Sequence, residues 1–265
     1  MIENEKDKKI IQEILEKLNE TYIEHKYFTD GADSRVILLN NKYLIKQNNS
    51  NSIKAEIEFF ENTFSTFFQK LVYYSPDFEF AVYEFIPGKP MKKITSSKEI
   101  ISKILEVAES FSSTSKPGFG YLGEEFSSWS EFLLHEAFHR NNIDDIDKSI
   151  VALAIKTLEK YPIDKKLIHG DFGTHNFIEN NGKFVGIIDP QTILGDSLYD
   201  ILFAICSNVS LLNTYKLEEL YSLIDEPKEK IHAMLIVVLY ARISRALKYH
   251  PNDIPAYLDY FNSII

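Results

Sequence analysis

The chain has 265 residues, 45% of them hydrophobic, which is enough for one large or two small domains with a filled core, and its single cysteine excludes an internal disulfide. Its net charge of −10 argues against nucleic acid as the main partner and is compatible with a cationic substrate. No apolar run is long enough to cross a membrane, and the first residues lack the apolar core of a signal peptide, so we expect a cytoplasmic protein without a membrane partner.

The N-terminal part of the sequence predicts a helix followed by strands. Apolar residues recur at helical spacing over residues 5–20. Three strands are expected next, at residues 23–29, 36–39 and 43–47. Asn40-Asn41 joins the last two, because asparagine tolerates the left-handed conformations of a tight hairpin.

Two features of these strands suit phosphate binding. The loop over residues 29–34 offers backbone N–H groups, helped by the Ser34 hydroxyl. Lys46 lies in the third strand, where the alternation of side chains lets its ammonium group point into a cleft instead of outward.

A helix and a further strand are expected before a break in the chain. The helix is predicted over residues 52–67 and carries Glu56 and Glu58. The strand at residues 78–84 leads into residues 85–88, where a Pro-Gly pair ends regular structure. We therefore expect a boundary between two lobes here.

Residues 118–123 match the GxGxxG pattern of dinucleotide-binding proteins. The match follows Pro117 instead of a hydrophobic strand, and no strand–helix–strand unit surrounds it. We interpret it as a loop.

A second motif, HExxH, occupies residues 135–139 of an expected helix. His135 and His139 with the intervening Glu136 have the spacing of a zinc peptidase, and Glu159 is a candidate third ligand, so this activity is an alternative hypothesis. The other interpretation is a helix that lines the substrate side of the second lobe. In that case a polyhydroxylated or cationic ligand contacts His135, Glu136, His139 and Asp144.

The most informative chemical pattern lies between residues 167 and 196. Short strands are expected at residues 167–168, 177–178 and 184–188, with Asn181-Gly182 as a hairpin turn. Asp171 and Asn176 then lie in a loop before the hairpin, and Asp189 lies just after it. Kinase-type phosphoryl transfer uses groups in this order: one carboxylate to hold the incoming hydroxyl and oxygen ligands to hold Mg²⁺ on the phosphates.

Taken together, these motifs resemble the aminoglycoside phosphotransferase and choline kinase superfamily, small-molecule relatives of the protein kinases. The resemblance covers the lysine strand, the helix with an acidic residue, the hinge, the HGDxxxxN loop at residues 169–176, the Ile-Asp-Pro strand end and residues 195–200. It implies an α+β, two-lobed, protein-kinase-like fold with nucleotide in the cleft. We expect a small antiparallel-sheet lobe over residues 1–86 and a larger, mostly helical lobe over residues 87–265.

The resemblance also implies roles for residues of the second lobe. Asp171 would be the catalytic residue, and Asn176 and Asp189 would be the metal ligands. His169 would brace the loop. Asp196 would cap the next helix and tie it to the catalytic loop.

On the nucleotide side, the resemblance pairs the strand lysine with Glu56. Glu58 is the alternative, because helix register is uncertain by a residue or two at this stage. The carbonyl of Glu84 and the N–H of Ile86 would meet the base, and Tyr83 would line the back of the base pocket. ATP is the expected nucleotide, with GTP as the second choice.

The rest of the chain predicts helices at residues 150–160, 197–208, 217–224 and 228–249. Only six residues separate Asp189 from Asp196, which is too short a segment to seat a peptide as protein kinases do. We therefore expect a Mg²⁺-dependent kinase for a small-molecule hydroxyl. An aminoglycoside is the first candidate, and a macrolide, choline, homoserine or another sugar-like metabolite are the alternatives. The oligomeric state stays open.

Overall fold

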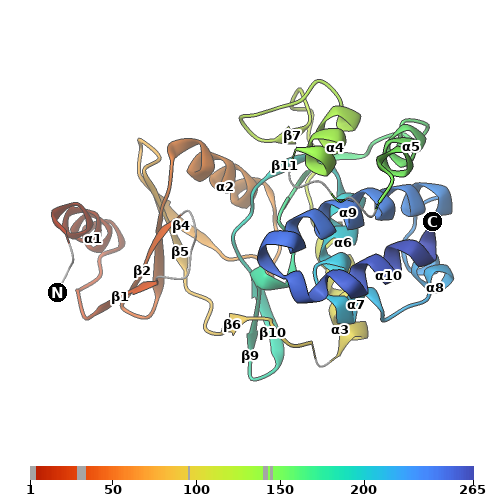
Figure 1. Ribbon diagram of the computed structural model, residues 1–265. Helices are drawn as coiled ribbons and strands as arrows, with labels where there is room; N and C mark the ends of the chain where they lie inside the picture. Colours follow the sequence, from red (N-terminus) through yellow and green to blue (C-terminus); the bar gives the residue numbers. More distant parts are fainter. Residues whose placement is uncertain (1–3, 29–33, 95, 140–142, 144–145) are drawn as a thin grey trace.

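The computed structural model describes residues 4–28, 34–94, 96–139, 143 and 146–265. Figure 1 shows two lobes: a small one built on a β-sheet with helices α1 (Glu5–Leu18) and α2 (Ser50–Asn62), and a larger one made mostly of helices. This arrangement confirms the predicted α+β, protein-kinase-like fold. The boundary between residues 86 and 87 stays a prediction.

The small lobe contains a five-stranded antiparallel sheet in the order β1-β2-β3-β5-β4. Its strands are β1 (His25–Phe28), β2 (Arg35–Leu39), β3 (Tyr43–Gln47), β4 (Leu71–Tyr74) and β5 (Phe80–Glu84). The expected hairpin between β2 and β3 is present. In its turn, Asn40 and Asn41 adopt left-handed φ angles of 54° and 52°.

Each face of this sheet is covered by a different helix, because side chains alternate along a strand. One face packs on α1 through Ile10, Ile11, Ile14, Ile37, Leu39, Ile45, Phe80 and Val82. The other face packs on α2 through Ile53, Ile57, Ala81 and Tyr83. Lys46 lies on the face that α2 covers, so the alternation directs its side chain toward Glu56 of that helix.

The helix predicted over residues 52–67 is too long. α2 ends at Asn62, and the backbone becomes extended at Thr63. The chain then runs along the larger lobe, where the Gln69 N–H donates to the Ile187 carbonyl at 3.1 Å. Phe64 continues the helical spacing but is 84% exposed, so the apolar pattern there does not mark a buried helix face.

Two further differences concern strands. β4 follows the segment after α2 and was not expected from the sequence. β5 begins two residues later than expected, because the chain turns at Phe78, whose φ is 59°.

The larger lobe surrounds the long helix α9 (Lys228–Tyr249), which is buried along most of its length. The other helices are α3 (Ser97–Glu109), α4 (Trp129–Phe138), α5 (Lys148–Leu158), α6 (Ser197–Cys206), α7 (Val209–Leu212), α8 (Leu217–Leu223) and α10 (Ile254–Ile264). The four helices predicted in this part correspond to α5, α6, α8 and α9. They form one core with the strands that carry the candidate site.

Two small sheets connect this core to the site. One has the order β10-β9-β6, with β6 (Lys89–Pro90), β9 (Phe177–Asn180) and β10 (Lys183–Ile187). The other has the order β7-β11-β8, with β7 (Gly120–Tyr121), β8 (Lys165–Ile168) and β11 (Ile193–Asp196). The catalytic hairpin predicted around Asn181-Gly182 is therefore the β9–β10 hairpin.

The GxGxxG match lies around β7 and is not followed by a helix that begins at its last glycine. A side chain at Gly120 would collide with Phe132, so this glycine serves close packing. The loop interpretation agrees with this geometry. Within the described residues, no helix combines the length and hydrophobicity needed to span a membrane.

Candidate active site

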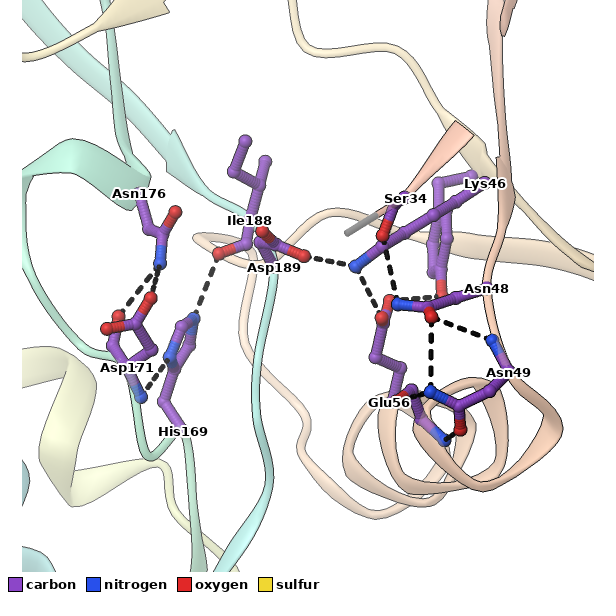
Figure 2. A network of polar contacts seen from close by, with 12 residues as sticks. Ser34, Lys46, Asn48, Asn49, Glu56, His169, Asp171, Asn176, Ile188 and Asp189 are labelled. Atoms are coloured by element: carbon purple, nitrogen blue, oxygen red, sulfur yellow. Dashed lines mark hydrogen bonds and ion pairs between the residues drawn. The ribbon is translucent and has the colours of Figure 1, made fainter. Parts of the chain in front are cut away.

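The predicted catalytic loop begins where β8 ends and reaches β9 through a short turn at Thr174–Asn176. Asn176 closes the loop, because its amide nitrogen donates to the backbone carbonyl and to the carboxylate Oδ2 of Asp171, each at 2.9 Å. In Figure 2 the amide oxygen of Asn176 points away from Asp171. The Ile188 N–H donates to the Asn176 carbonyl at 3.1 Å, so the two predicted metal ligands, Asn176 and Asp189, start from adjoining backbone.

His169 is fully buried and joins the loop to the strand end that carries Asp189. Its Nε2 donates to the Ile188 carbonyl at 3.0 Å, and its Nδ1 accepts from the Asp171 N–H at 3.3 Å, which assigns the tautomer from the partners. Burial lowers the pKa of His169 to about 4, because a charged ring is poorly solvated among Phe59 and Phe68. These are the contacts that a bracing residue needs.

A residue that the sequence analysis missed, His175, also contacts Asp171. Its Nε2 lies 2.9 Å from Oδ2 of Asp171. A side chain at Gly173 would collide with the His175 ring, so the glycine makes room for this contact. His175 lies four residues after Asp171, and this spacing was the only sequence signal for the pair.

The charge of Asp171 follows from these contacts. Burial by itself raises the pKa of Asp171, but the hydrogen bond from His175 and the positive charge around it lower the pKa by more, to well below its usual range. Both His175 and Asn176 bond Oδ2, and no described residue donates to Oδ1, which is therefore the oxygen that another donor could reach. A hydroxyl group is such a donor.

Lys46 lies between two carboxylates that come from distant parts of the chain. Its ammonium group pairs with Oε1 of Glu56 and with Oδ1 of Asp189 (Figure 2). Burial alone would lower the pKa of Lys46, but the two carboxylates raise it by more, so the ammonium group stays charged. Glu58, the alternative partner, instead pairs with Lys116 at 3.2 Å.

Glu56 and Asp189 differ in their surroundings. Glu56 is buried, which raises its pKa, and the Tyr83 hydroxyl donates to its Oε2 at 2.8 Å. Tyr83 therefore holds the carboxylate of Glu56 in place, whereas the contact of Tyr83 with a base stays a prediction. Asp189 has a φ of 66°, and its side chain is 51% exposed, so the carboxylate is open to solvent as well as to Lys46.

The remaining nucleotide-side predictions fall on the phosphate loop and the hinge. Ser34 accepts a hydrogen bond from Asn48 at 3.0 Å, and the preceding loop residues, 29–33, lie outside the described part of the chain. The Glu84 carbonyl accepts from the Gln69 side chain at 3.0 Å. A base at the hinge would share this carbonyl with Gln69, while the Ile86 N–H donates to no other described residue.

The prediction for Asp196 is wrong in one part. Asp196 caps α6, because its Oδ1 accepts from the Leu198 N–H at 3.0 Å, but its Oδ2 pairs with Lys230 at 2.9 Å and not with the catalytic loop. Asp200, one turn further along α6, makes the tie instead: both of its oxygens lie 3.1 Å from the Gly170 N–H. Burial raises the pKa of Asp200 to about 7.

The geometry of α4 explains its HExxH match without zinc. The ligand atoms of His135, Glu136 and His139 lie within 4.8 Å of one another. Glu136, however, is fully buried and bonded to Arg245 at 2.6 Å and to the Tyr121 hydroxyl at 2.8 Å. Its carboxylate is therefore neutralised by a guanidinium group that would also repel a metal ion.

The substrate-contact interpretation of α4 changes accordingly. Buried Glu136 has no surface left for direct contact with a ligand, whereas His135 and His139 stack at the partly exposed edge of the helix, with ring centroids 4.0 Å apart. Asp144 lies outside the described residues. Arg245, which no local pattern indicated, links α9 to α4, and its charge contributes to the lowered pKa of Asp171.

Comparison with known proteins agrees with this geometry. The model of a family described as the phosphotransferase enzyme family matches residues 26–215, which include the parts of the site described above except Lys230 and Arg245. The chain belongs to this family. The membership confirms the predicted phosphotransferase and replaces the zinc-peptidase alternative.

Individual relatives are more distant. Hygromycin-B 4-O-kinase from Escherichia coli is 30% identical over 98 residues, which are 32% of this chain and only 29% of that protein. The crystal structure of a thermostable mutant of aminoglycoside phosphotransferase APH(4)-Ia, in complex with AMP-PNP and hygromycin B, matches with a TM-score of 0.65 and 16% identity over 96% of each chain. The GDP complex of aminoglycoside 2'-phosphotransferase-IIIa matches with a TM-score of 0.56 and 13% identity over 97% of each chain. At these identities the two structures show the shared fold.

The neutral state of buried His169 predicts a pH-dependent stability. The unfolded chain binds a proton at His169 near pH 6.5, whereas the folded chain does so only near pH 4. The contribution of neutral His169 to the free energy of unfolding is therefore fully present above pH 6.5 and is lost as the pH falls toward 4. We expect the free energy of unfolding of the wild type, minus that of His169→Gln, to fall by about 2 kcal/mol between pH 7 and pH 5. Urea unfolding at the two pH values measures it.

The difference in free energy of unfolding between the wild type and His169→Gln isolates His169. The raised pKa of Asp200 makes the folded protein more stable as the pH falls over the same range, but this effect is present in both proteins and is removed by the subtraction. Glutamine carries a donor nitrogen at a similar reach but does not titrate. A difference that is the same at both pH values would show that His169 accepts a proton in the folded protein as readily as in the unfolded chain.

Proposed function

We propose that the protein transfers the γ-phosphate of a nucleoside triphosphate, in a Mg²⁺-dependent reaction, to a hydroxyl group of an aminoglycoside-type small molecule. The observation that carries the proposal is the joint geometry of Lys46, Asp189 and Asp171. An ammonium group, an open carboxylate and an oriented second carboxylate lie in one network of polar contacts (Figure 2). These are the groups that phosphoryl transfer requires.

The nucleotide side of the cleft supports this proposal. Lys46 is charged and held by Glu56, so it offers a fixed positive charge to phosphate oxygens. Asn176 and Asp189 offer an amide oxygen and a carboxylate, the hard oxygen ligands that Mg²⁺ prefers. When bound there, Mg²⁺ would neutralise charge on the phosphates. ATP is the proposed nucleotide and GTP the second, and the related structures named above were solved with AMP-PNP and with GDP.

The acceptor side depends on Asp171. Two donors bond its Oδ2 and no described residue donates to its Oδ1, which would accept the hydrogen of an incoming hydroxyl group and orient that oxygen. The lowered pKa of Asp171 keeps it ionised at neutral pH, which is the state that such a contact needs. The charge of Arg245, which pairs with Glu136 of α4, contributes to that lowered pKa from α9.

The short segment between Asp189 and α6 supports a small acceptor, because it leaves no room for a peptide platform. We propose an aminoglycoside because the named relative and structures act on or bind hygromycin B or are aminoglycoside phosphotransferases. The test is nucleotide consumption with ATP and with GTP against a panel of aminoglycosides, a macrolide, choline and homoserine. We expect turnover with at least one aminoglycoside. Turnover with choline or homoserine alone would contradict the acceptor assignment.

The two carboxylates of the cleft should have separable effects. Asp171→Ala is expected to bind Mg·ATP nearly normally but to lower kcat by roughly two orders of magnitude or more, because the acceptor is no longer oriented. Asp189→Ala is expected to weaken nucleotide binding mainly when Mg²⁺ is present, because it removes a metal ligand. Calorimetric titration of ATP with and without Mg²⁺, together with kcat, measures both effects.

Asp164→Ala is the matched control, because this carboxylate is largely exposed, pairs with Lys166 and precedes β8, whereas the loop follows β8. Near-normal kcat in folded Asp171→Ala would remove Asp171 from catalysis. An identical Mg²⁺ dependence in the wild type and in Asp189→Ala would remove the metal role.

A further inference from the structure

The segment between Asp189 and α6 is bound to the rest of the protein along its length. The Gln191 N–H donates to the His169 carbonyl at 2.8 Å, and the Leu122 N–H donates to the Thr192 carbonyl at 3.1 Å. Residues 193–196 then form β11 between β7 and β8. In protein kinases the corresponding region is a long loop whose order is regulated. Here it is short and held on both sides.

Thr192 lies at the centre of this segment and reaches into the small lobe. Its side chain is fully buried, and its hydroxyl donates to the Ala55 carbonyl of α2 at 2.7 Å, a contact between residues 137 positions apart. Its φ is 33°, a left-handed conformation that a β-branched residue adopts only when its surroundings impose it. Ala55 immediately precedes Glu56, the partner of Lys46.

Other contacts attach the remaining length of α2 to the larger lobe. The Phe59 ring belongs to the core of that lobe and packs edge-on against His169. Glu58 pairs with Lys116, and the Asn62 carbonyl accepts a hydrogen bond from Ser112. These contacts lie two to six residues beyond Glu56. Thr192 is the contact next to it.

We propose that Thr192 is a positioning residue for the nucleotide site: its hydroxyl fixes α2 at the height at which Glu56 meets Lys46. The inference rests on the proposed function for its consequence, because a correctly held Lys46 is what a nucleotide would bind. It implies that the site is assembled permanently, without phosphorylation of a regulatory loop. The segment after Asp189 thus links the residue proposed as a metal ligand to α2 through Thr192.

The test compares Thr192→Val with Thr192→Ser. Valine has nearly the same shape but places a methyl group against the Ala55 carbonyl, whereas serine keeps the hydroxyl. By calorimetric titration of Mg·ATP we expect Kd to rise roughly fivefold or more in Thr192→Val and to stay within about twofold in Thr192→Ser. Amide hydrogen exchange of residues 50–62, measured without nucleotide, should be faster in Thr192→Val only. If the valine protein is insoluble, Thr192→Ala replaces it.

A double-mutant comparison tests whether Thr192 acts through Glu56. In a Glu56→Gln background, Thr192→Val should change Kd by less than about twofold, because the contact that it positions is already lost. Lys116→Ala is the control for another contact of α2: it removes the partly exposed ion pair with Glu58 and should change Kd by less than about twofold.

The outcomes separate the inference from the proposed function. If the wild type binds neither Mg·ATP nor Mg·GTP, the proposed function is wrong, and the exchange rates alone decide whether Thr192 holds α2. If the wild type binds nucleotide and folded Thr192→Val binds it equally well, Thr192 does not position the site. An equal loss in both Glu56 backgrounds would also overturn the proposal.

Discussion

The buried ammonium group of Lys46 is the constraint on which the two lobes depend. Its side chain is only 10% exposed, and a charge in such a place is costly unless opposite charges compensate it. Glu56 of α2 and Asp189 at the end of β10 supply that compensation from two directions. β3, α2 and the segment after β10 must therefore meet at this point for the charge of Lys46 to be compensated.

The second half of the site is tied to the same point through backbone rather than charge. His169 bonds the carbonyl of Ile188, the residue before Asp189, while its ring packs against Phe59 of α2. The catalytic loop, the metal-side strand and the helix that carries Glu56 thus share one aromatic cluster. A displacement of α2 would disturb both the nucleotide side and the acceptor side, because Phe59 and Glu56 lie on the same helix.

Much of the site could be predicted because its groups occur in local patterns. Asp171, Asn176 and Asp189 stand in fixed order around a hairpin, and Asn40-Asn41 indicated the β2–β3 turn from conformational preference alone. The end of α2 could not be predicted in the same way. Exposed Phe64 continues the helical spacing, and only the contact of the following segment with β10 shows that the helix has ended.

Residues whose role depends on long-range contacts were harder to identify. Asp196 and Asp200 both follow the loop in sequence, and only the packing of α6 under Gly170 shows that Asp200 makes the tie. Arg245 of α9 neutralises Glu136 although the two residues are 109 positions apart. The local HExxH pattern contains no sign of this partner, so it predicts a metal site. The choice between Glu56 and Glu58 likewise depended on helix register, which the sequence leaves uncertain by a residue or two.

The most direct test of this account is a double-mutant cycle between Lys46→Met and Glu56→Gln, measured as the free energy of unfolding in urea without nucleotide. Lys46→Met alone should cost about 3–5 kcal/mol, because it leaves a buried carboxylate without its partner. The double variant should recover part of that cost, with a coupling energy of about 1–3 kcal/mol. Additive effects of the two substitutions would show that the folded protein does not depend on this ion pair, and the central claim would be wrong.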